Sequence, residues 1–451
     1  MFYKVLVANR GEIALRIIRT LREMGLKSVA VYSLVDKELP HVRLADEAIC
    51  IGAGPAKDSY LNEKAVITAA EVTDADAIHP GYGFLAENAR FREICQSAGI
   101  HFIGPSLRSI RLMGNKIKAR AIMKRRGVPV IDGSERGIKD PAVAFDEAVR
   151  VGFPVMLKAS LGGGGKGMRL VHSPHNFTNA FLSAQAEVKA AFGDNELYIE
   201  KYIKDGRHIE VQLLGDLFGN IVHFFDRNCS IQSSYQKVLE EAPSPNLLDK
   251  LRGVLCKTAV KIGSVLKYSS LGTIEFLVDK NNKFYFIEMN TRIQVEHPVT
   301  EMVTGVDLLK EQILAAMGKP LRLNQNNINV QGHAIECRIN AVNWEKMIPS
   351  PGVVSKIHIP GGLGIRFDTY LSSGTEISSY YDSLVGKLIV SACNREDAIK
   401  KLRVALDELD IYGVLTNKEL FTRIIKEKEF IEGGYDTGFF KSFRCRCLGK
   451  A

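Results

Sequence analysis

The first 106 residues alternate between short apolar runs and segments with the apolar spacing of a helix. Residues 4–8 (KVLVA) have the pattern of a buried strand, and residues 12–25 then place Ile and Leu side chains on one helical stripe before a glycine. Further strand patterns follow at 28–33, 77–88 and 101–106, the last two breaking into glycine turns. Strands that alternate with helices pair in parallel, so this region predicts a doubly wound parallel domain.

The pattern changes after residue 106. Residues 107–130 are predicted to be helical and to end near Gly127, and strands dominate from there on. The predicted strands lie at 154–160, 168–173, 196–203, 208–216, 220–230, 272–279 and 283–290. The chain is strand-rich again from residue 331 and closes with helices at 396–407 and 417–427. We therefore expect three domains, at 1–114, 115–330 and 331–447, and an α/β and α+β fold overall.

The composition is that of an ordinary globular enzyme. The 451 residues are 46% hydrophobic and 25% charged, and the apolar runs are too short for a membrane span. Residues 1–8 have a strand pattern and lack the charged start and cleavage site of a signal peptide, so we expect a cytoplasmic protein. Eight scattered cysteines without a C-x-x-C pair predict reduced thiols rather than disulfides or zinc.

The net charge of +9 raises the question of nucleic-acid binding. Lysine and arginine are spread along the chain, however, and no DNA- or RNA-binding motif is present. We interpret the excess charge as a solvated surface with pockets for anionic substrates, and we expect neither nucleic acid nor membrane as a partner.

A glycine-rich loop, GGGGKG at 162–167, allows three interpretations as a nucleotide site. A Walker A loop requires Ser or Thr after Gly165-Lys166, where Gly167 stands instead. The G-x-G-x-x-G fingerprint does match, but it must open a helix, whereas residues 168–173 have a strand pattern. The remaining interpretation is a flap between two antiparallel strands whose amides close over phosphates. A flexible hairpin without a ligand is the alternative.

Charged residues beside this loop favour a nucleotide site. Lys158 ends the strand before the loop, where its ammonium can meet a phosphate. Glu200 and Lys201 end a later strand next to backbone groups that can pair with an adenine edge. Taken alone, these two charges are also typical of a solvated surface.

The segment 286–301, FIEMNTRIQVEHPVTE, carries the strongest local signal. In an extended chain, alternate side chains share a face. One face would then carry five polar groups, namely Glu288, Asn290, Arg292, Gln294 and Glu296. A solvated edge strand is the alternative explanation.

The strand at 272–279 strengthens the functional interpretation. If it forms a hairpin with 283–290, Glu275 lies opposite Glu288. Two opposed carboxylates repel unless one is protonated or a cation lies between them. With Asn290 nearby, this oxygen-rich set suits Mg²⁺ or Mn²⁺ that bridges nucleotide phosphates. Arg292 can then bind a small planar oxyanion, and Glu296 can act as a base toward it.

The chain as a whole resembles biotin carboxylase of the ATP-grasp superfamily, in its form as a free-standing subunit of acetyl-CoA carboxylase. The resemblance covers about residues 1–445 and is carried by eight motifs: ANRGEIA (8–14), HPGYGFLAEN (79–88), MGNK (113–116), GGGGKGM (162–168), EKYI (200–203), QKVLEEAPSP (236–245), EMNTRIQVEHPVTE (288–301) and ECRINA (336–341). It implies a pre-ATP-grasp domain at 1–114, an ATP-grasp domain at 115–330 with a mobile lid at about 131–203, and a C-terminal biotin carboxylase domain.

The resemblance also implies the reaction, in which ATP drives the carboxylation of carrier-bound biotin by bicarbonate through carboxyphosphate. It is the first half-reaction of acetyl-CoA carboxylase and leads to malonyl-CoA and fatty acids. The implied ATP-binding residues are Lys116, Lys158, Gly164, Gly165, Glu200, Lys201, Tyr202, Ile203, His208, Tyr235, Glu275 and Glu288. Those implied to hold two Mg²⁺ or Mn²⁺ ions are Glu275, Glu288 and Asn290.

Further residues carry the chemistry that the resemblance implies. Bicarbonate would be bound by Lys237, Arg292, Gln294 and the backbone of Val295. Glu296 would deprotonate bicarbonate, and Arg338 would bind biotin and stabilise its enolate. Tyr235 departs from the family, which usually has a histidine in a basic run here. Because a tyrosine cannot carry a positive charge, an altered ATP affinity is expected.

The partners follow from the same resemblance. The biotin-accepting Met-Lys-Met triplet of the family is absent, so biotin is expected on a separate biotin carboxyl carrier protein, with carboxyl transferase subunits downstream. A homodimer is expected as well. The alternatives are another ATP-grasp ligase that works through an acylphosphate, and a catalytically silent nucleotide-binding regulator.

Overall fold

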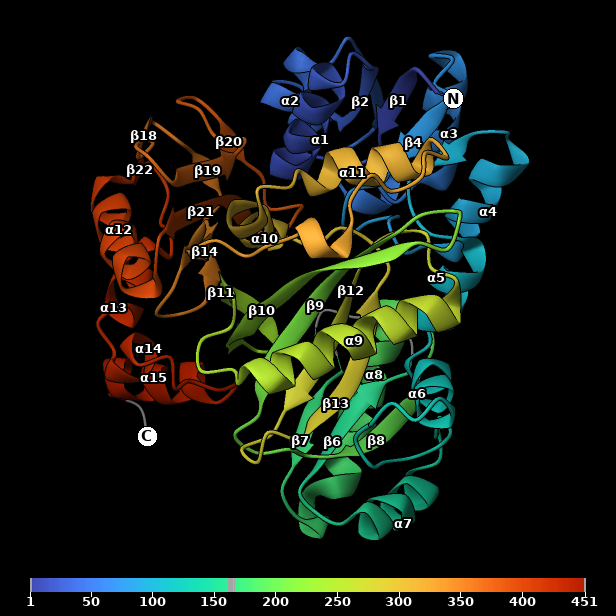
Figure 1. Ribbon diagram of the computed structural model, residues 1–451, viewed down its shortest axis with the longest axis vertical. Helices are drawn as coiled ribbons and strands as arrows, with labels where there is room; N and C mark the ends of the chain where they lie inside the picture. Colours follow the sequence, from blue (N-terminus) through green and yellow to red (C-terminus); the bar gives the residue numbers. More distant parts are fainter. Residues whose placement is uncertain (1, 161–164, 166, 450–451) are drawn as a thin grey trace.

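The structure is a computed structural model that describes residues 2–160, 165 and 167–449. The N-terminal region contains one sheet of five parallel strands in the order β3-β2-β1-β4-β5. These strands are β1 (Lys4–Val7), β2 (Lys27–Ser33), β3 (Glu47–Gly52), β4 (Ala77–His79) and β5 (His101–Phe102). The helices between them are α1 (Gly11–Glu23), α2 (Pro40–Leu44), α3 (Glu63–Val72) and α4 (Ala89–Ser97), with 3₁₀ turns η1 (Leu34–Asp36) and η2 (Ala56–Asp58). The predicted doubly wound parallel domain is confirmed (Figure 1).

The helical segment predicted for 107–130 is two helices, α5 (Leu107–Met113) and α6 (Lys116–Arg125). Gly114 ends the first helix, and the side chain of Asn115 caps the second by accepting a hydrogen bond from the amide of Lys118 at 2.9 Å. This break lets Lys116 begin a helix of its own.

The segment 131–203, which we call the lid, has its own three-stranded antiparallel sheet in the order β7-β6-β8. It comprises β6 (Val155–Ala159), β7 (Arg169–Val171), β8 (Leu197–Lys201), α7 (Pro141–Val151), η3 (Pro174–Asn176) and α8 (Phe177–Phe192). Apolar side chains of the two helices and the sheet form a separate core. The glycine-rich loop therefore joins two antiparallel strands, as predicted.

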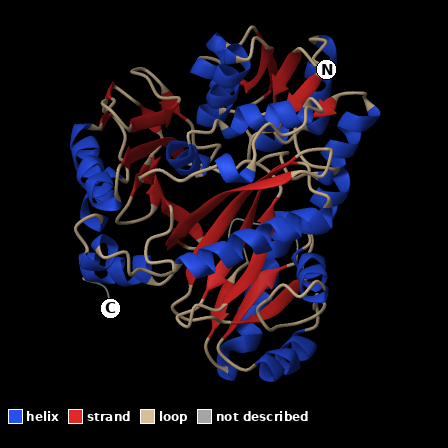
Figure 2. Ribbon diagram, viewed as in Figure 1, coloured by secondary structure: helices blue, strands red, loops and turns tan. Residues whose placement is uncertain are grey.

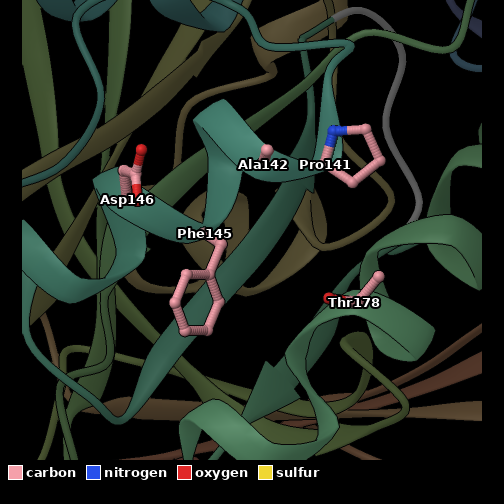
Figure 3. A pocket seen from close by; sticks show the side chains of 5 residues that line it. All are labelled: Pro141, Ala142, Phe145, Asp146 and Thr178. Carbon is pink, nitrogen blue, oxygen red and sulfur yellow. The ribbon is translucent and has the colours of Figure 1, made fainter.

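A pocket of the lid lies between its two helices. It is lined by Pro141, Ala142, Phe145 and Asp146 at the start of α7 and by Thr178 of α8 (Figure 3). None of these residues belongs to the predicted site, so the pocket is separate from it.

The centre of the molecule is an eight-stranded sheet in the order β13-β12-β9-β10-β11-β14-β21-β19, crossing the picture in Figure 2. Its strands are β9 (Arg207–Gly215), β10 (Ile221–Ser233), β11 (Gln236–Ala242), β12 (Ser270–Val278), β13 (Phe284–Asn290), β14 (His333–Asn340), β19 (Ile365–Thr369) and β21 (Leu384–Ala392). The helix α9 (Asp249–Leu266) packs its apolar face on β9 and β10. Because β11 pairs with β14, this sheet runs across the domain boundary predicted near residue 330.

The other elements pack at several places around this sheet: two helices cover its C-terminal strands β14 and β21, and another lies between β12 and the N-terminal helix α1 (Figure 1). The helices are α10 (His297–Thr304), α11 (Leu308–Ala316), α12 (Arg395–Glu408), α13 (Lys418–Ile424), α14 (Lys428–Ile431) and α15 (Phe439–Leu448), with a 3₁₀ turn η4 (Gln325–Asn327). Short strand pairs are formed by β15 (Val342–Asn343) with β16 (Ile348–Pro349), β17 (Gly352–Val353) with β20 (Glu376–Ile377), and β18 (Lys356–His358) with β22 (Asp410–Tyr412). Within the described residues, no helix combines the length and apolar character needed to cross a membrane. All eight cysteines are free, as expected.

Candidate active site

The predicted hairpin between β12 and β13 is present, and Glu275 lies directly opposite Glu288. In the structure each carboxylate is paired with a lysine. The Lys116 ammonium lies 2.6 Å from Oε2 of Glu288, and the Lys237 ammonium lies 2.8 Å from Oε1 of Glu275. The Asn290 amide donates to the same oxygen of Glu275 at 2.8 Å. The three oxygen-bearing side chains predicted as metal ligands therefore lie together on the hairpin.

The prediction that one extended strand carries all five polar groups up to Glu296 is wrong. The strand β13 ends at Asn290, and residues 291–296 form a turn that leads into α10. The cause is Glu87 of the N-terminal domain, whose carboxylate accepts hydrogen bonds from the Thr291 amide at 2.8 Å and from Arg292 Nε at 2.9 Å. β13 is the edge strand of the sheet, and its ladder with β12 ends where Asn290 lies opposite Thr273.

The turn nevertheless delivers its side chains to the same place. Gln294 donates to Oε1 of Glu275 at 3.0 Å, and Glu296 lies 2.6 Å from the ammonium of Lys237. Arg292 instead points toward Glu87 and also donates to Oδ1 of Asn290 at 2.9 Å. The carbonyl oxygen of Val295 accepts from Lys387 at 3.0 Å.

Lys237 of β11 is the electrostatic centre of the site. Its Nζ lies 2.5 Å from Glu210, 2.8 Å from Glu275 and 2.6 Å from Glu296. Burial alone would lower the pKa of Lys237, but the three carboxylates raise it well above its ordinary value. The ammonium therefore stays charged and holds three otherwise repelling carboxylates together.

Glu296 is shared by two cations. Arg338 Nη2 lies 3.0 Å from its Oε2, while Lys237 contacts its Oε1. Burial alone would raise the pKa of Glu296, but Lys237 and Arg338 lower it below its ordinary value. The carboxylate is therefore ionised, so it can accept a proton, and a substrate that draws Lys237 or Arg338 away from it would make it a stronger base.

Arg338 of β14 has a second carboxylate partner, Glu240 of β11. The Arg338 Nε donates to Oε1 of Glu240 at 2.6 Å. Burial would lower the pKa of Arg338, but Glu240 and Glu296 raise it further above its ordinary value. Arg338 therefore lies between two buried carboxylates. It stands at the edge of the group formed by Lys237, Glu210, Glu275 and Glu296, which we call the Lys237 cluster.

Sequence reasoning missed Arg227 of β10, which has no exposed side-chain surface. Its guanidinium donates to Oε1 of Glu210 at 2.5 Å and to Oε1 of Gln294 at 2.6 Å. Gln212, Thr273 and Thr300 accept its other hydrogen bonds. Because Oε1 of Gln294 accepts from Arg227, the amide nitrogen of Gln294 must point toward Glu275. The signal in the sequence was weak, because Asp226 and Asn228 flank this arginine in β10 and give the segment an ordinary polar appearance.

Glu210 was also missed, although the sequence contains a signal for it. His208, Glu210 and Gln212 alternate along β9, so they share the face that carries Glu275 on the next strand. The ring of His208 lies 3.2 Å from Oε2 of Glu275 through Nε2 and contacts the Gln232 amide through Nδ1 at 3.0 Å. This face of β9 thus carries His208, which was predicted to belong to the site, and Glu210, which was not.

The lid contributes a second charged group. Lys158 Nζ lies 2.6 Å from Glu200, which also pairs with Arg120 of α6 at 3.1 Å. Burial would raise the pKa of Glu200, but Lys158 and Arg120 lower it. Lys201 points elsewhere and donates to the backbone carbonyls of Gly152 at 2.7 Å and Phe153 at 3.0 Å.

Tyr235 lies in the turn between β10 and β11 and faces the lid. Its hydroxyl contacts the sulfur of Met156 in β6 at 3.7 Å. Gly165 approaches the same turn so closely that a Cβ there would lie 2.9 Å from the carbonyl oxygen of Ser234. Gly164, predicted to bind ATP, lies outside the described residues, and Tyr202 and Ile203 follow the last residue of β8.

An antiparallel lid with a glycine-rich loop, together with an edge hairpin whose two opposed carboxylates pair with Lys116 and Lys237 from other elements, defines an ATP-grasp enzyme. Three protein-family models match this chain, each over a different part, and they agree with this class. "Biotin carboxylase, N-terminal domain" matches residues 1–110, "Carbamoyl-phosphate synthase L chain, ATP binding domain" matches 115–324, and "Biotin carboxylase C-terminal domain" matches 336–442.

Individual relatives narrow the class to one family. The chain is 52% identical to biotin carboxylase from a Nostoc species, over 97% of this chain and 98% of that protein, and 51% identical to the one from Allochromatium vinosum, over 96% and 97%. A crystal structure of a biotin carboxylase complex with β,γ-ATP from Campylobacter jejuni superposes with a TM-score of 0.96, at 47% identity over 98% of this chain and 99% of that one. The chain belongs to the biotin carboxylase family and is an ATP-dependent ligase.

Proposed function

We propose that this protein carboxylates biotin on a separate carrier protein, with bicarbonate as the source of CO₂ and ATP as the driving force. The observation that carries the proposal is the position of the buried Glu296 carboxylate between the side chains of Lys237 and Arg338. A base flanked by two cations is what two reacting anions, bicarbonate and a nucleotide phosphate, require.

The nucleotide would lie between the lid and the central sheet. Its phosphates would meet the ammonium groups of Lys116 and Lys158 and the amides of the glycine-rich loop, where Gly165 closely approaches the Tyr235 turn. The adenine edge would pair with backbone groups near Glu200, Lys201 and Ile203 at the end of β8. The remaining proposed contacts are Gly164, Tyr202, His208 and Tyr235.

The proposed metal site uses Glu275, Glu288 and Asn290. The fit is good because these are carboxylate and amide oxygens, the ligands that Mg²⁺ prefers, and because lysine ammonium groups now neutralise both carboxylates. Bound Mg²⁺ or Mn²⁺ would supply positive charge to the nucleotide phosphates. A structurally similar 2-oxoglutarate carboxylase domain, at a TM-score of 0.97 and 46% identity, is described in complex with MgADP and bicarbonate.

Bicarbonate would bind among Lys237, Arg292, Gln294 and the backbone of Val295. The orientation of the Gln294 amide supports this, because Arg227 forces its nitrogen to face the site as a donor. Arg292 would exchange its contact with Glu87 for the anion. Glu296 would take the bicarbonate proton as the oxygen attacks the γ-phosphorus, and ADP would leave.

Carboxyphosphate formed in this way would break into CO₂ and phosphate. The phosphate would then accept the N–H proton of biotin, and the resulting biotin nitrogen would attack CO₂. Arg338 would stabilise the negative charge on the ureido oxygen of biotin. Closure of the lid would exclude water from the labile intermediate.

The molecule that finally accepts the carboxyl group from carboxybiotin is a separate proposal. We propose acetyl-CoA, so that the enzyme serves malonyl-CoA and fatty acid synthesis with carboxyl transferase subunits. A similar protein from Methanothermobacter thermautotrophicus, 48% identical over 98% of this chain, is named as one of the subunits of a pyruvate carboxylase. Identification of the transferase that co-purifies with a biotinylated carrier would decide between the acceptors.

We also propose a homodimer, because the similar 2-oxoglutarate carboxylase domain is described as a dimer. Light scattering of the purified protein tests this directly. A mass near 100 kDa is expected, about twice the 49.9 kDa of one chain, and a monomer at micromolar concentration would contradict it.

The reaction itself is tested by ATP hydrolysis with bicarbonate and biotin supplied separately and together. We expect turnover that requires both. ATP hydrolysis that does not depend on biotin would favour another ATP-grasp ligase. Nucleotide binding without any hydrolysis would favour a catalytically silent regulator.

A further inference from the structure

Glu336 of β14 is a buried carboxyl group without an assigned role. Its side chain has no exposed surface, and neither carboxyl oxygen has a hydrogen-bond partner among the described residues. An ionised carboxylate in such a place would lose its hydration without gaining a partner in exchange, which strongly disfavours the charged form. The position of Glu336 therefore requires a physical explanation.

The backbone register places Glu336 beside the proposed biotin site. Glu336 and Arg338 alternate along β14 and share a face, while Cys337 between them points into the apolar core. On the neighbouring strand β11, Glu240 is the residue directly opposite Glu336. Two buried carboxyl groups thus face each other next to the arginine proposed to bind biotin.

The nearby cations are already occupied. Arg338 donates to Glu240 at 2.6 Å and to Glu296 at 3.0 Å. Lys387, which lies directly opposite Arg338 on β21, contacts Glu12 at 3.1 Å and the Val295 carbonyl at 3.0 Å. Neither cation forms an ion pair with Glu336 within the part of the chain that the structure describes.

We propose that Glu336 is a neutral carboxylic acid that holds a proton beside Glu240, and that it is a positioning residue for Arg338. An ionised Glu336 would add a third anion to the two that already share the guanidinium. With Glu336 neutral, Arg338 keeps the orientation set by Glu240 and Glu296 and remains available to an incoming ureido group.

The ionisation behaviour of the pair agrees with this geometry. Burial raises the pKa of Glu336 well above its ordinary value, although Lys387 opposes the change. Burial also raises the pKa of Glu240, but the charge of Arg338 opposes this change. Because Arg338 donates directly to Glu240, the ionised member is Glu240 and the proton lies on Glu336. The other titratable or charged groups around Glu336 are Arg338, Lys387, Glu296, Tyr82 and Cys337.

The pH dependence of the unfolding equilibrium tests whether Glu336 carries a proton in the folded protein. A group whose pKa is raised in the folded state stabilises the fold at low pH and loses that contribution as pH rises above the unfolded pKa. From about pH 5 upward, the unfolding constant of the wild type should rise relative to that of Glu336→Gln by about tenfold per pH unit. Glu345→Gln, at an exposed position, is the matched control and should run parallel to the wild type. Parallel curves for Glu336→Gln would overturn the proposal.

Kinetics test the positioning role, which rests on the proposed function. The wild type should lose kcat/KM for free biotin at alkaline pH as Glu336 ionises, and Glu336→Gln should lose this alkaline decline. Glu240→Gln, which removes the direct partner of Arg338, should lower kcat/KM for biotin at every pH. Identical pH profiles for wild type and Glu336→Gln would overturn the positioning role.

The proposal can still be tested if the wild type is inactive or if the Glu336→Gln variant does not fold. If the wild type shows no biotin-dependent turnover, the proposed function fails while the unfolding data still decide where the proton lies. If Glu336→Gln does not fold, infrared spectra of the intact wild type at neutral pD decide instead. A band from a protonated, buried carboxylic acid is expected, and its absence would overturn the proposal.

Discussion

At the scale of single residues, the site is a set of charges that compensate one another. Glu210, Glu275 and Glu296 surround one ammonium, and their repulsion is tolerable only because Lys237 stays charged. Each member therefore has a role that depends on its neighbours, and single substitutions should separate those roles.

Replacement of Glu296 by Gln should abolish the proposed base and leave nucleotide binding in place. The amide keeps the size of the side chain but cannot accept the bicarbonate proton, so kcat should fall by about 10²- to 10⁴-fold. Steady-state carboxylation kinetics and ATP titration measure the two effects. Retention of full kcat would show that another group acts as the base.

Replacement of Arg227 by Met should weaken bicarbonate binding through Gln294. Without the charged donor, the Gln294 amide is free to rotate, and the bicarbonate KM should rise by about tenfold or more, as for the loss of one charge-assisted hydrogen bond. The matched control is Arg252→Met, because Arg252 pairs at 2.7 Å with Asp226, the neighbour of Arg227 on β10. Equal effects of both variants on bicarbonate KM would contradict the orienting role.

At the scale of elements, strand alternation predicted much of the site. It placed Glu275 opposite Glu288, because hairpin register follows from sequence alone once the turn is located. It failed beyond Asn290, since the turn at 291–296 is made by Glu87, which lies 204 residues away from Thr291 in the chain.

Strand alternation also fails on β11. Lys237 and Glu240 are three positions apart, so a regular strand would place them on opposite faces. Both side chains reach the site because the pairing register between β10 and β11 is irregular between these two residues. Contacts and bulges of this kind have no local sequence signal.

The strand β11 also joins the sheet to the C-terminal helices through Glu241. This buried carboxylate accepts from His333 at 2.5 Å, from Arg395 at 2.7 Å and from the hydroxyl of Tyr435. Burial would raise the pKa of Glu241, but His333 and Arg395 lower it from 4.5 to about 2. A lowered pKa stabilises the fold above pH 4.5, and this contribution is lost as pH falls toward 2.

Glu241→Gln should therefore be less stable than the wild type at neutral pH, by up to about 3 kcal/mol on the linkage relation. The difference in unfolding free energy should shrink as pH falls below about 4.5, which denaturant titrations at several pH values measure. Glu345→Gln again serves as the exposed control. A difference that does not change with pH would show that packing, rather than charge, carries the effect.

At the scale of the whole molecule, the site forms where three parts of the chain meet. The N-terminal region supplies Glu87, the central segment supplies the Lys237 cluster, and β14 and β21 supply Arg338 and Lys387. Lys237, Arg338 and Lys387 all lie on strands of the eight-stranded sheet. The sites proposed for the phosphates and for biotin are therefore held in fixed positions relative to each other. The division of the chain at 114 and 330 stays a prediction about domains.

The measurement that tests the proposed reaction most directly is the transfer of label from bicarbonate to biotin. With ATP, Mg²⁺ and free biotin, the wild type should form labelled carboxybiotin with one ADP released for each label transferred. Arg338→Ala should still bind ATP but lose this transfer. Labelled carboxybiotin formed equally well by Arg338→Ala, or ADP release by the wild type without any labelled biotin, would contradict the proposed reaction.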